Sequence, residues 1–349
     1  MPAYKDNSTG KWYCKFYFED YQGNRHQKLK RGFKRKKDAL SYERTFLESS
    51  QYQPTITFGA FVEIYRKDIY PQLRQHTIQT KSYRYNRIMP YFEDRPLTEI
   101  TAIDIKKWQN DLILEGLKST YINDLQKELS AVFNHAVKYY NLKENPARQA
   151  GKATIPDEMP SRMRFWTLNE YRQVIPSIKD IKAKTAVNML YWTGIRKGEL
   201  YALTWADINF AGKQVAITKS YQRLKGKDVI TPTKTYESRT LLLPDTTIEQ
   251  LSEYKVKCYH TAPDDPVFPW TKRFIEDGIK QGAEASGVSR IHVHGLRHSH
   301  ASYLINAGVN IVLISKRLGH KDTSMTLDTY SHFFPTDEID LIDKINKSI

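Results

Sequence analysis

The sequence predicts a multidomain α+β protein. It would combine a small N-terminal three-stranded sheet plus a helix, an all-helical second domain, and a mainly helical third domain with a small antiparallel sheet. Three observations indicate this arrangement. Apolar residues near the N-terminus alternate with a period of two, as they do in strands. They then recur at helical spacing up to about residue 147. Beyond a proline-containing segment, helical patterns alternate with short strand-like runs.

The first domain, residues 1–50, is expected to form strands backed by one helix. The alternating apolar residues of KWYCKFYFED are Trp12, Cys14, Phe16 and Phe18. DYQGN supplies turn chemistry, and RHQKLKRGF is typical of a second strand. We expect a short third strand near Phe33, followed by a helix over KKDALSYERTFLES.

The exposed face of this small sheet is expected to combine aromatic and basic side chains, namely Tyr13, Lys15, Tyr17, Lys28, Lys30 and Arg31. A run of charges alone is most simply a solvated surface. Aromatic rings interleaved with the charges favour a sheet that docks on DNA. This pattern by itself leaves both interpretations open.

The second domain, residues 56–147, is expected to be entirely helical. SSQYQPTIT precedes it as a linker. Thr101 followed by Asp104 predicts a capping box at the start of a helix. A longer helix is expected over TYINDLQKELSAVFNHAVKYYNL. Its apolar stripe is Ile122, Leu125, Leu129, Val132, Ala136 and Tyr139. KENPA would end it at Pro146.

Residues 148–164 carry Gly151, Pro156 and Pro160 without periodicity, which predicts an interdomain linker. The third domain, residues 165–349, would alternate helices with strands at KQVAITKS, DVITPT and SRTLLLP.

Composition narrows the class of protein. The chain has 349 residues, of which 40% are hydrophobic and 27% charged, as in a globular protein. We find no apolar run long enough to span a bilayer and no signal peptide in the polar opening segment. Cys14 and Cys258 lie far apart, which argues for a reducing compartment and against a disulfide framework. We therefore expect a cytoplasmic protein that does not insert into membranes.

The charge balance points to a polyanionic partner. The net charge is +15, and the pI is about 9.4. Residues 1–50 hold twelve Lys and Arg against six Asp and Glu, so they carry +6 of that charge. Membrane surface is the alternative, but the sequence has no long amphipathic helix with a basic face. Nucleic acid is the better interpretation.

Two clusters in the third domain place cations at turns. In YWTGIRKGELYALTWADIN, Arg196 lies at a helix-to-helix corner, where free backbone N–H groups favour an anion. The alternative is a surface arginine or an ion pair with Glu199. In TPTKTYESRTLLLP, Lys234 lies in a turn between strands, and alone it would be merely solvated.

A third cluster is HVHGLRHSHASYLINAG, in which His294 and Arg297 are three residues apart and should share a helical face. The four histidines of this segment, His292, His294, His298 and His300, offer a metal site as an alternative. It is disfavoured because acids and cysteines are remote in sequence and Arg297 would place a positive charge beside the metal. Tyr303 fits the apolar pattern and is expected in the core.

The fourth cluster is GHKDTSMTLDTYSH, with His320 and Tyr330. Its alternative interpretation is a surface loop whose tyrosine only packs.

Together the clusters supply arginines, a lysine, histidines and a tyrosine without paired acids. Such a set suits phosphodiester chemistry without a metal, because guanidinium forks match phosphate oxygens and a phenol in a cationic pocket can attack phosphorus.

The four blocks TGIRKGEL, TKTYESR, HGLRHSHAS and LGHKDTSMTLDTYSH, in this order, resemble the tyrosine recombinase family, the integrases of phages and conjugative transposons. The first two domains are similar to the arm-binding and core-binding domains of that family, and the third to its catalytic domain. By resemblance, Tyr330 is the nucleophile, and Arg196 and Arg297 clamp the scissile phosphate. Lys234 would protonate the leaving 5′-hydroxyl, His294 would handle the proton of the nucleophile, and His320 would hydrogen-bond the phosphate.

The resemblance implies a site-specific recombinase that needs no cofactor or metal and works through a 3′-phosphotyrosyl intermediate. Its partners would be double-stranded DNA at core and arm sites, three further copies in a homotetramer, and an excisionase and a host DNA-bending protein as candidate helpers. It would associate with the nucleoid of a bacterial host. The alternatives are a topoisomerase of type IB, a Xer-like resolvase or invertase, and a non-catalytic DNA-binding protein.

Two further features are expected by the same comparison. His332 would tune or pack rather than catalyse. The C-terminal apolar stripe Ile339, Ile342 and Ile345 would form a short helix that docks either on its own domain or on a neighbouring protomer. The sequence leaves open the attachment sites, the overlap length, and whether the element is a phage or a transposon.

Overall fold

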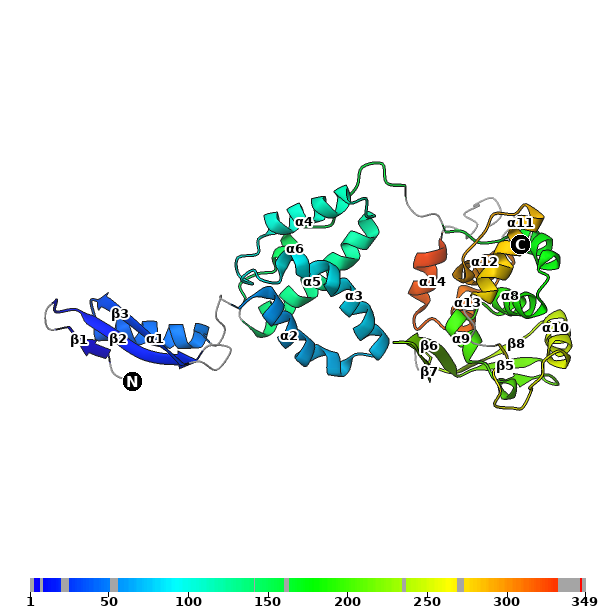
Figure 1. Cartoon of the computed structure of the whole chain (residues 1–349), viewed down its shortest axis with the longest axis horizontal. Coiled ribbons are helices and arrows are strands. Elements are labelled where there is room, and N and C mark those ends of the chain that lie inside the picture. Colours follow the sequence, from blue (N-terminus) through cyan, green and yellow to red (C-terminus); the bar gives the residue numbers. More distant parts are fainter. Residues whose placement is uncertain are drawn as a thin grey trace. The chain divides into compact units, whose positions relative to one another are not determined.

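The computed structural model describes residues 3–6, 9–19, 25–50, 56–140, 142–159, 163–233, 237–268, 273–331 and 346 (Figure 1). The chain divides into two compact units, Met1–Pro160 and Ser161–Ile349. Several residues singled out in the sequence lie outside the described ones: Lys234, His332, the turn at 20–24, and the apolar residues of the C-terminal tail.

The N-terminal part of the first unit is an antiparallel sheet with one helix. Its described strands are β1 (Ala3–Lys5), β2 (Trp12–Glu19) and β3 (Arg25–Phe33), in the order β1-β2-β3, and α1 (Lys36–Ser50) follows. Cys14 and Phe16 of β2 are buried with Ala39 of α1, as the alternation predicts. The prediction of a separate strand near Phe33 was wrong: Phe33 ends β3, and the third strand is β1.

Strand register corrects the predicted composition of the exposed face. Tyr13 pairs with Arg31, whereas Cys14 pairs with Lys30 and Phe16 with Lys28. Directly opposed residues share a face of the sheet. Lys28 and Lys30 therefore lie on the same face as Cys14 and Phe16, and the prediction that they share the exposed face with Tyr13 was wrong. Tyr13, Lys15, Tyr17 and Arg31 do share the outer face.

The outer face has aromatic and cationic side chains in contact. Tyr4 stacks on Tyr13 with ring centroids 5.5 Å apart. The guanidinium of Arg31 lies 5.7 Å from the centre of the Tyr13 ring, and that of Arg25 lies 4.4 Å from the Tyr17 ring. These cation–π pairs hold aromatic rings and positive charges together on the outer face of the sheet.

The rest of the first unit is helical, as predicted. Its helices are α2 (Phe58–Ile69), η1 (Tyr70–Gln72), α3 (Gln75–Phe92), α4 (Ala102–Leu114), α5 (Ser119–Tyr139) and α6 (Pro146–Gln149). The predicted stripe of α5 is buried from Ile122 to Ala136, but its last member, Tyr139, which is also the last residue of α5, is 57% exposed. The predicted capping box is present: the N–H of Asp104 donates to Oγ1 of Thr101, and the N–H of Thr101 to Oδ2 of Asp104.

The predicted linker is partly bound to this helical unit. Nδ2 of Asn123 donates to the carbonyl of Ala153 at 2.9 Å, and the N–H of Ala153 donates to Oδ1 of Asn123 at 2.8 Å. Nε2 of Gln126 donates to the carbonyl of Gly151. Glu158 accepts from the N–H of Ser119 at 3.1 Å, at the start of α5. The segment as far as Glu158 is thus hydrogen-bonded to the helices of the first unit, and its role as an interdomain linker stays a prediction.

The second unit surrounds the buried helix α8 (Ile181–Thr193), which packs against the helices that begin at Asp245, Phe274 and Val293. Its other helices are α7 (Leu168–Val174), η2 (Ile175–Ser177), α9 (Lys197–Ala202), η3 (Trp205–Asp207), α10 (Asp245–Val256), α11 (Phe274–Ser286), α12 (Val293–Asn306), α13 (Ile311–Leu318) and α14 (Thr323–Tyr330). Among the described residues, no helix has the length and apolar character that crossing a membrane requires.

The strands of this unit form two small antiparallel groups. β4 (Ile208–Asn209), β5 (Gln214–Ile217) and β8 (Arg239–Leu242) form one sheet, and β6 (Lys219–Leu224) pairs with β7 (Lys227–Pro232). The three predicted strand-like runs coincide with β5, β7 and β8. Lys234 belongs to the connection from β7 to β8.

Candidate active site

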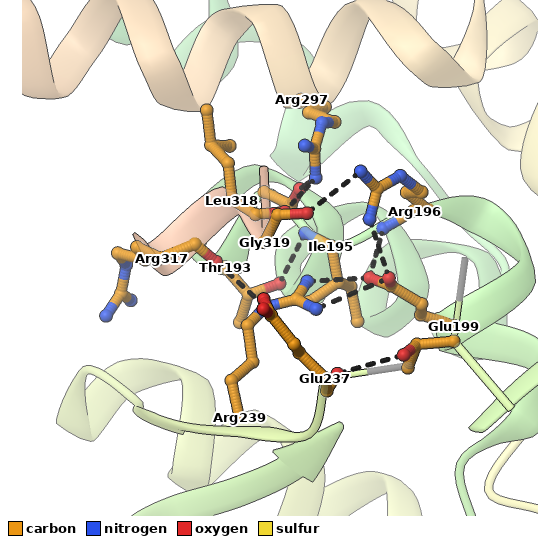
Figure 2. A network of polar contacts seen from close by, with 12 residues as sticks. Thr193, Ile195, Arg196, Glu199, Glu237, Arg239, Arg297, Arg317, Leu318 and Gly319 are labelled. Atoms are coloured by element: carbon orange, nitrogen blue, oxygen red, sulfur yellow. Dashed lines mark hydrogen bonds and ion pairs between the residues drawn. The ribbon is translucent and has the colours of Figure 1, made fainter. Parts of the chain in front are cut away.

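Consecutive backbone carbonyls at the C-terminal end of α13 are held by arginines from three other elements (Figure 2). The hydrogen bonds are Arg239 Nε to Arg317 O at 3.0 Å, Arg297 Nη1 to Leu318 O at 2.8 Å, and Arg196 Nη2 to Gly319 O at 3.1 Å. The last carbonyls of a helix lack partners within it and carry the negative end of its dipole. The end of α13 therefore gathers guanidinium groups from β8, from α12 and from the start of α9.

A buried carboxylate lies between two of these arginines. Glu199 is 1% exposed. Its Oε1 accepts from Nη1 of Arg196 at 2.9 Å, and its Oε2 from Nη2 of Arg239 at 2.7 Å. Burial alone would raise the pKa of Glu199, but the hydrogen bonds and charges of Arg239 and Arg196 outweigh it, so that the pKa lies below its usual value. The ion pair of Arg196 with Glu199, considered as an alternative to anion binding, is present.

Arg297 combines burial with an unused donor. It is 3% exposed, and its Nη1 donates to the carbonyls of Gly194 at 2.7 Å and Leu318 at 2.8 Å. Its Nη2 is buried and has no hydrogen-bond partner within the described part of the chain. Burial and the nearby charge of Arg196 lower the pKa of Arg297 to about 9. A buried guanidinium nitrogen without a partner is costly, which favours an anion as its ligand.

The close approach of α8 and α12 depends on a glycine. Gly194 ends α8 with φ +65°, a conformation that disfavours other residues. A Cβ at Gly194 would lie 2.6 Å from Cδ2 of His300 and 2.8 Å from a methyl of Leu318. Arg196 lies two residues after Gly194. The turn at this glycine therefore determines where the side chain of Arg196 lies in the site.

Partial burial and the same two arginines lower the pKa values of two histidines that were predicted to be catalytic. His294, on the first turn of α12, and His320, just after α13, both have lowered pKa values, and that of His320 falls to about 4. Partial burial is the main cause, followed by the charges of Arg297 and Arg196. Nδ1 of His320 lies 2.6 Å from Oγ1 of Thr326. His320 is thus neutral at pH 7.

Tyr330, the last residue of α14, is buried in its own unit and is 1% exposed. Its hydroxyl lies 2.8 Å from Nδ1 of His298 on α12. Burial raises the pKa of Tyr330 to about 12, although the charge of Arg297 opposes this shift. The alternative interpretation, a surface loop whose tyrosine only packs, does not hold, because Tyr330 ends a helix and its hydroxyl is hydrogen-bonded to His298.

The structure therefore brings together five of the six predicted catalytic residues in one unit: Arg196, His294, Arg297, His320 and Tyr330. The sixth, Lys234, lies outside the described residues, between Thr233 and Glu237. Oγ1 of Thr233 donates to the carbonyl of Glu237 at 2.9 Å, so the described residues that flank 234–236 are hydrogen-bonded to each other.

Sequence reasoning missed three participants. Glu199 was considered only as an ion-pair alternative, Arg239 was not singled out although it stands in TKTYESR, and His298 was considered only as a metal ligand. One signal was available for His298: it lies four residues after His294 on a helix, and their ring centroids are 4.8 Å apart. Among the described residues, no group of three His, Cys, Asp or Glu side chains is placed to hold a metal ion.

Comparison with known families agrees with this geometry. The second unit matches the Phage integrase family over residues 164–336. Residues 57–113 match the Phage integrase, N-terminal SAM-like domain, and residues 2–50 match the Arm DNA-binding domain. The chain belongs to the tyrosine recombinases of the phage integrase family. The recombinase is therefore an enzyme of the site-specific tyrosine recombinase class, and the predictions of its family and enzyme class are confirmed.

Individual relatives cover most of this recombinase. The ICEBs1 integrase of Bacillus subtilis is 27% identical over 336 residues, which are 89% of this chain and 90% of the relative. The integrase of Staphylococcus phage L54a is 25% identical, with 86% of this chain and 96% of the relative covered. Tyrosine recombinase XerD of Pasteurella multocida is also 25% identical, over 78% of this chain and 93% of its own.

Solved structures share the fold. The Tn1549 transposon integrase in complex with circular intermediate DNA gives a TM-score of 0.69 at 17% identity, with 84% of this chain and all of that chain covered. A lambda integrase tetramer bound to a Holliday junction gives a TM-score of 0.58 at 19% identity, with 95% and 94% covered. The predicted fold class is confirmed.

Proposed function

We propose that this recombinase integrates a mobile DNA element and, with a helper protein, excises it. One observation carries the proposal: Nη2 of Arg297 is buried, has no hydrogen-bond partner among the described residues, and lies in a site where Arg196 and a buried tyrosine also converge. Guanidinium groups of this kind match the oxygens of a phosphodiester. The ICEBs1 and L54a relatives are integrases by name, which supports a mobile element as the substrate.

In the proposed reaction, Oη of Tyr330 attacks the scissile phosphorus and the bond from phosphorus to the 5′-oxygen breaks. The phenol proton passes to a neutral imidazole, for which His294 is the candidate, and Lys234 donates a proton to the leaving 5′-oxygen, which departs as a hydroxyl. Arg196 and Arg297 stabilise the charge on the non-bridging oxygens, and His320 donates a hydrogen bond to one of them. The resulting 3′-phosphotyrosyl ester retains the energy of the original bond, so rejoining is the same step reversed.

The nucleophile needs activation in this scheme. With a pKa near 12, Tyr330 is protonated at pH 7, and its hydroxyl is bonded to His298. Attack requires the hydroxyl to exchange this hydrogen bond for the scissile phosphate, where the arginine charges lower the cost of ionisation.

The proposed partners follow from the domains and the relatives. The helical domain and the catalytic unit would bind a core site, and the outer face of the N-terminal sheet would bind an arm site. Four protomers would exchange strands through a Holliday junction, as the lambda integrase tetramer has been captured on one. An excisionase and a host DNA-bending protein would assist, and the complex would form on the bacterial nucleoid.

The test uses nicked suicide duplexes that carry candidate attachment sites, incubated with the full-length protein. We expect a covalent complex that peptide mapping assigns to Tyr330, and none with Tyr330→Phe. A covalent adduct that persists in Tyr330→Phe would refute the nucleophile. Relaxation of supercoiled plasmid without any recombinant product would instead identify a topoisomerase-like enzyme.

A further inference from the structure

We infer that Arg239 is a positioning residue of this recombinase: it holds Glu199 and the C-terminal turn of α13, and through them it presets Arg196, Arg297 and His320 for strand cleavage. The inference rests on the proposed function. It concerns Arg239, the first residue of β8 and the last residue of the TKTYESR block.

The guanidinium of Arg239 is fully committed to protein contacts. Nε donates to the carbonyl of Arg317 at 3.0 Å, Nη1 to Oε1 of Glu199 at 3.3 Å, and Nη2 to Oε2 of Glu199 at 2.7 Å. The side chain is 12% exposed. All three nitrogens are therefore engaged, in contrast to Nη2 of Arg297, which has no partner in the part of the chain that the structure describes. We therefore assign Arg239 to holding the other side chains of the site in position, and Arg297 to binding the phosphate.

The first route of action runs through Glu199. Both oxygens of Glu199 accept from Arg239, and both also accept from Arg196, through Nη1 and through the backbone N–H at 3.0 Å. With Arg239 fixing the carboxylate from one side, Arg196 has a single position in which it meets both Glu199 and the carbonyl of Gly319. Without Arg239 the carboxylate would be held by Arg196 alone, and the position of Arg196 would be less constrained.

The second route runs through the turn after α13. The guanidinium packs directly against Gly319, where an added Cβ would lie 2.6 Å from Nη1 of Arg239. Gly319 also has φ +68°, so the chain turns sharply there. The carbonyl of Leu318 holds Arg297, and His320 follows the glycine. A shift of this turn would thus move a clamp residue and a histidine together.

A lysine cannot reproduce this arrangement. The three contacts of Arg239 diverge in the plane of one guanidinium, two toward a carboxylate and one toward a carbonyl. An ammonium is a compact charge without that fork. Arg239→Lys therefore keeps the charge of the site while removing its geometry, which makes it the informative variant.

The experiment compares Arg239→Lys with the wild type and with Arg172→Lys, an exposed arginine of α7 that serves as the control. Two quantities are measured with the full-length protein: affinity for a core-site duplex, and the single-turnover rate of covalent complex formation on a suicide duplex. We expect Arg239→Lys to keep its affinity within about 2-fold and to form the complex about 10²-fold more slowly, because a small misplacement of binding groups can cost that much in rate. The control should match the wild type in both.

A double variant tests whether Arg239 acts through Glu199. If it does, Arg239→Lys with Glu199→Gln should be no slower than the slower single variant. Rate losses that multiply would overturn that route. Equal loss of affinity and rate in Arg239→Lys would make Arg239 a general structural residue and overturn the inference, as would a normal rate. If the wild-type protein formed no covalent complex, the proposed function itself would be refuted. That result is distinguishable from the outcomes that concern Arg239.

Discussion

The hydroxyl of Tyr330 and Nδ1 of His298 lie 2.8 Å apart, and this hydrogen bond joins the end of α14 to α12. Burial raises the pKa of Tyr330 to about 12. Burial, together with the nearby imidazole of His294 and the charge of Arg297, lowers the pKa of His298 to about 4. Both groups are therefore neutral at pH 7. The proposed nucleophile is held by an uncharged partner, which allows release without breaking an ion pair.

His298→Ala should loosen α14, because it removes the hydrogen bond that holds its last residue. Hydrogen exchange of the amides of 323–330 should become faster, and the free energy of unfolding should fall by about 1 kcal/mol. Mass spectrometry of peptides from α14 and thermal melts measure the two effects. His292→Ala, which changes an exposed histidine at the start of α12, is the control. Unchanged exchange in His298→Ala would show that the bond does not restrain the helix.

Arg297→Ala and Arg297→Lys should both slow covalent complex formation, by on the order of 10²–10³-fold for loss of one preorganised donor. Lysine should not rescue, because one ammonium cannot reach both carbonyls that hold Nη1 and also present a second nitrogen to the phosphate. Single-turnover rates on suicide duplexes measure the effect. Arg290→Ala, which removes an exposed arginine nearby, controls for charge. A normal rate in Arg297→Ala would refute the clamp.

The two faces of the N-terminal sheet should differ in DNA binding. Arg31→Ala removes a cation from the outer face, whereas Lys30→Ala removes a cation of the same sign from the face that carries Cys14. We expect Arg31→Ala to weaken binding to arm-site duplexes and to reduce the slope of log K against log salt by about 0.9. Lys30→Ala should change both quantities less. The affinities of both variants for arm-site duplexes are measured across a salt series. Equal effects of the two substitutions would show that the outer face is not the docking surface.

Acid should destabilise the second unit through His300. This side chain is buried, its Nε2 accepts from Nε of Arg317, and burial followed by the charge of Arg317 lowers its pKa to about 3. Between the usual histidine pKa and this value, the unfolded chain binds a proton that the folded chain does not, so stability falls as pH falls. From pH 7 to pH 5 the loss should be about 2 kcal/mol for this group.

His300→Gln should flatten this dependence, because glutamine does not titrate. Denaturant unfolding at pH 7 and pH 5 measures the difference, with His292→Gln as the exposed control. If His300→Gln lost as much stability as the wild type between the two pH values, His300 would not be the titrating group.

Deletion of the residues after Phe334 should impair pairing of two DNA duplexes more than cleavage of one. The reason is the apolar stripe Ile339, Ile342 and Ile345, which we expect to dock on a neighbouring protomer. Native gels of paired complexes and suicide-duplex cleavage give the two measurements. Parallel loss of both activities would place the tail on its own subunit.

The sequence by itself determined the features that depend on neighbours along the chain. The stripe from Ile122 to Ala136 and the capping box of Thr101 are encoded within single helices, and the structure contains both. Four short motifs sufficed to identify the family, because each keeps its reactive residues within a few positions of a helix end or a turn.

Tertiary structure alone decided what depends on pairing between distant segments. The register of β2 against β3 places Lys30 opposite Cys14. The alternation of residue types along each strand would be the same in another register, so the sequence alone does not give this pairing. Asn123 fixed the start of the predicted linker through its bonds to Ala153, and Glu199 became the common partner of Arg196 and Arg239. Tyr330 came to lie on His298 for the same reason: hydrogen bonds between residues far apart in sequence form only when packing has set the distance, and no local pattern records it.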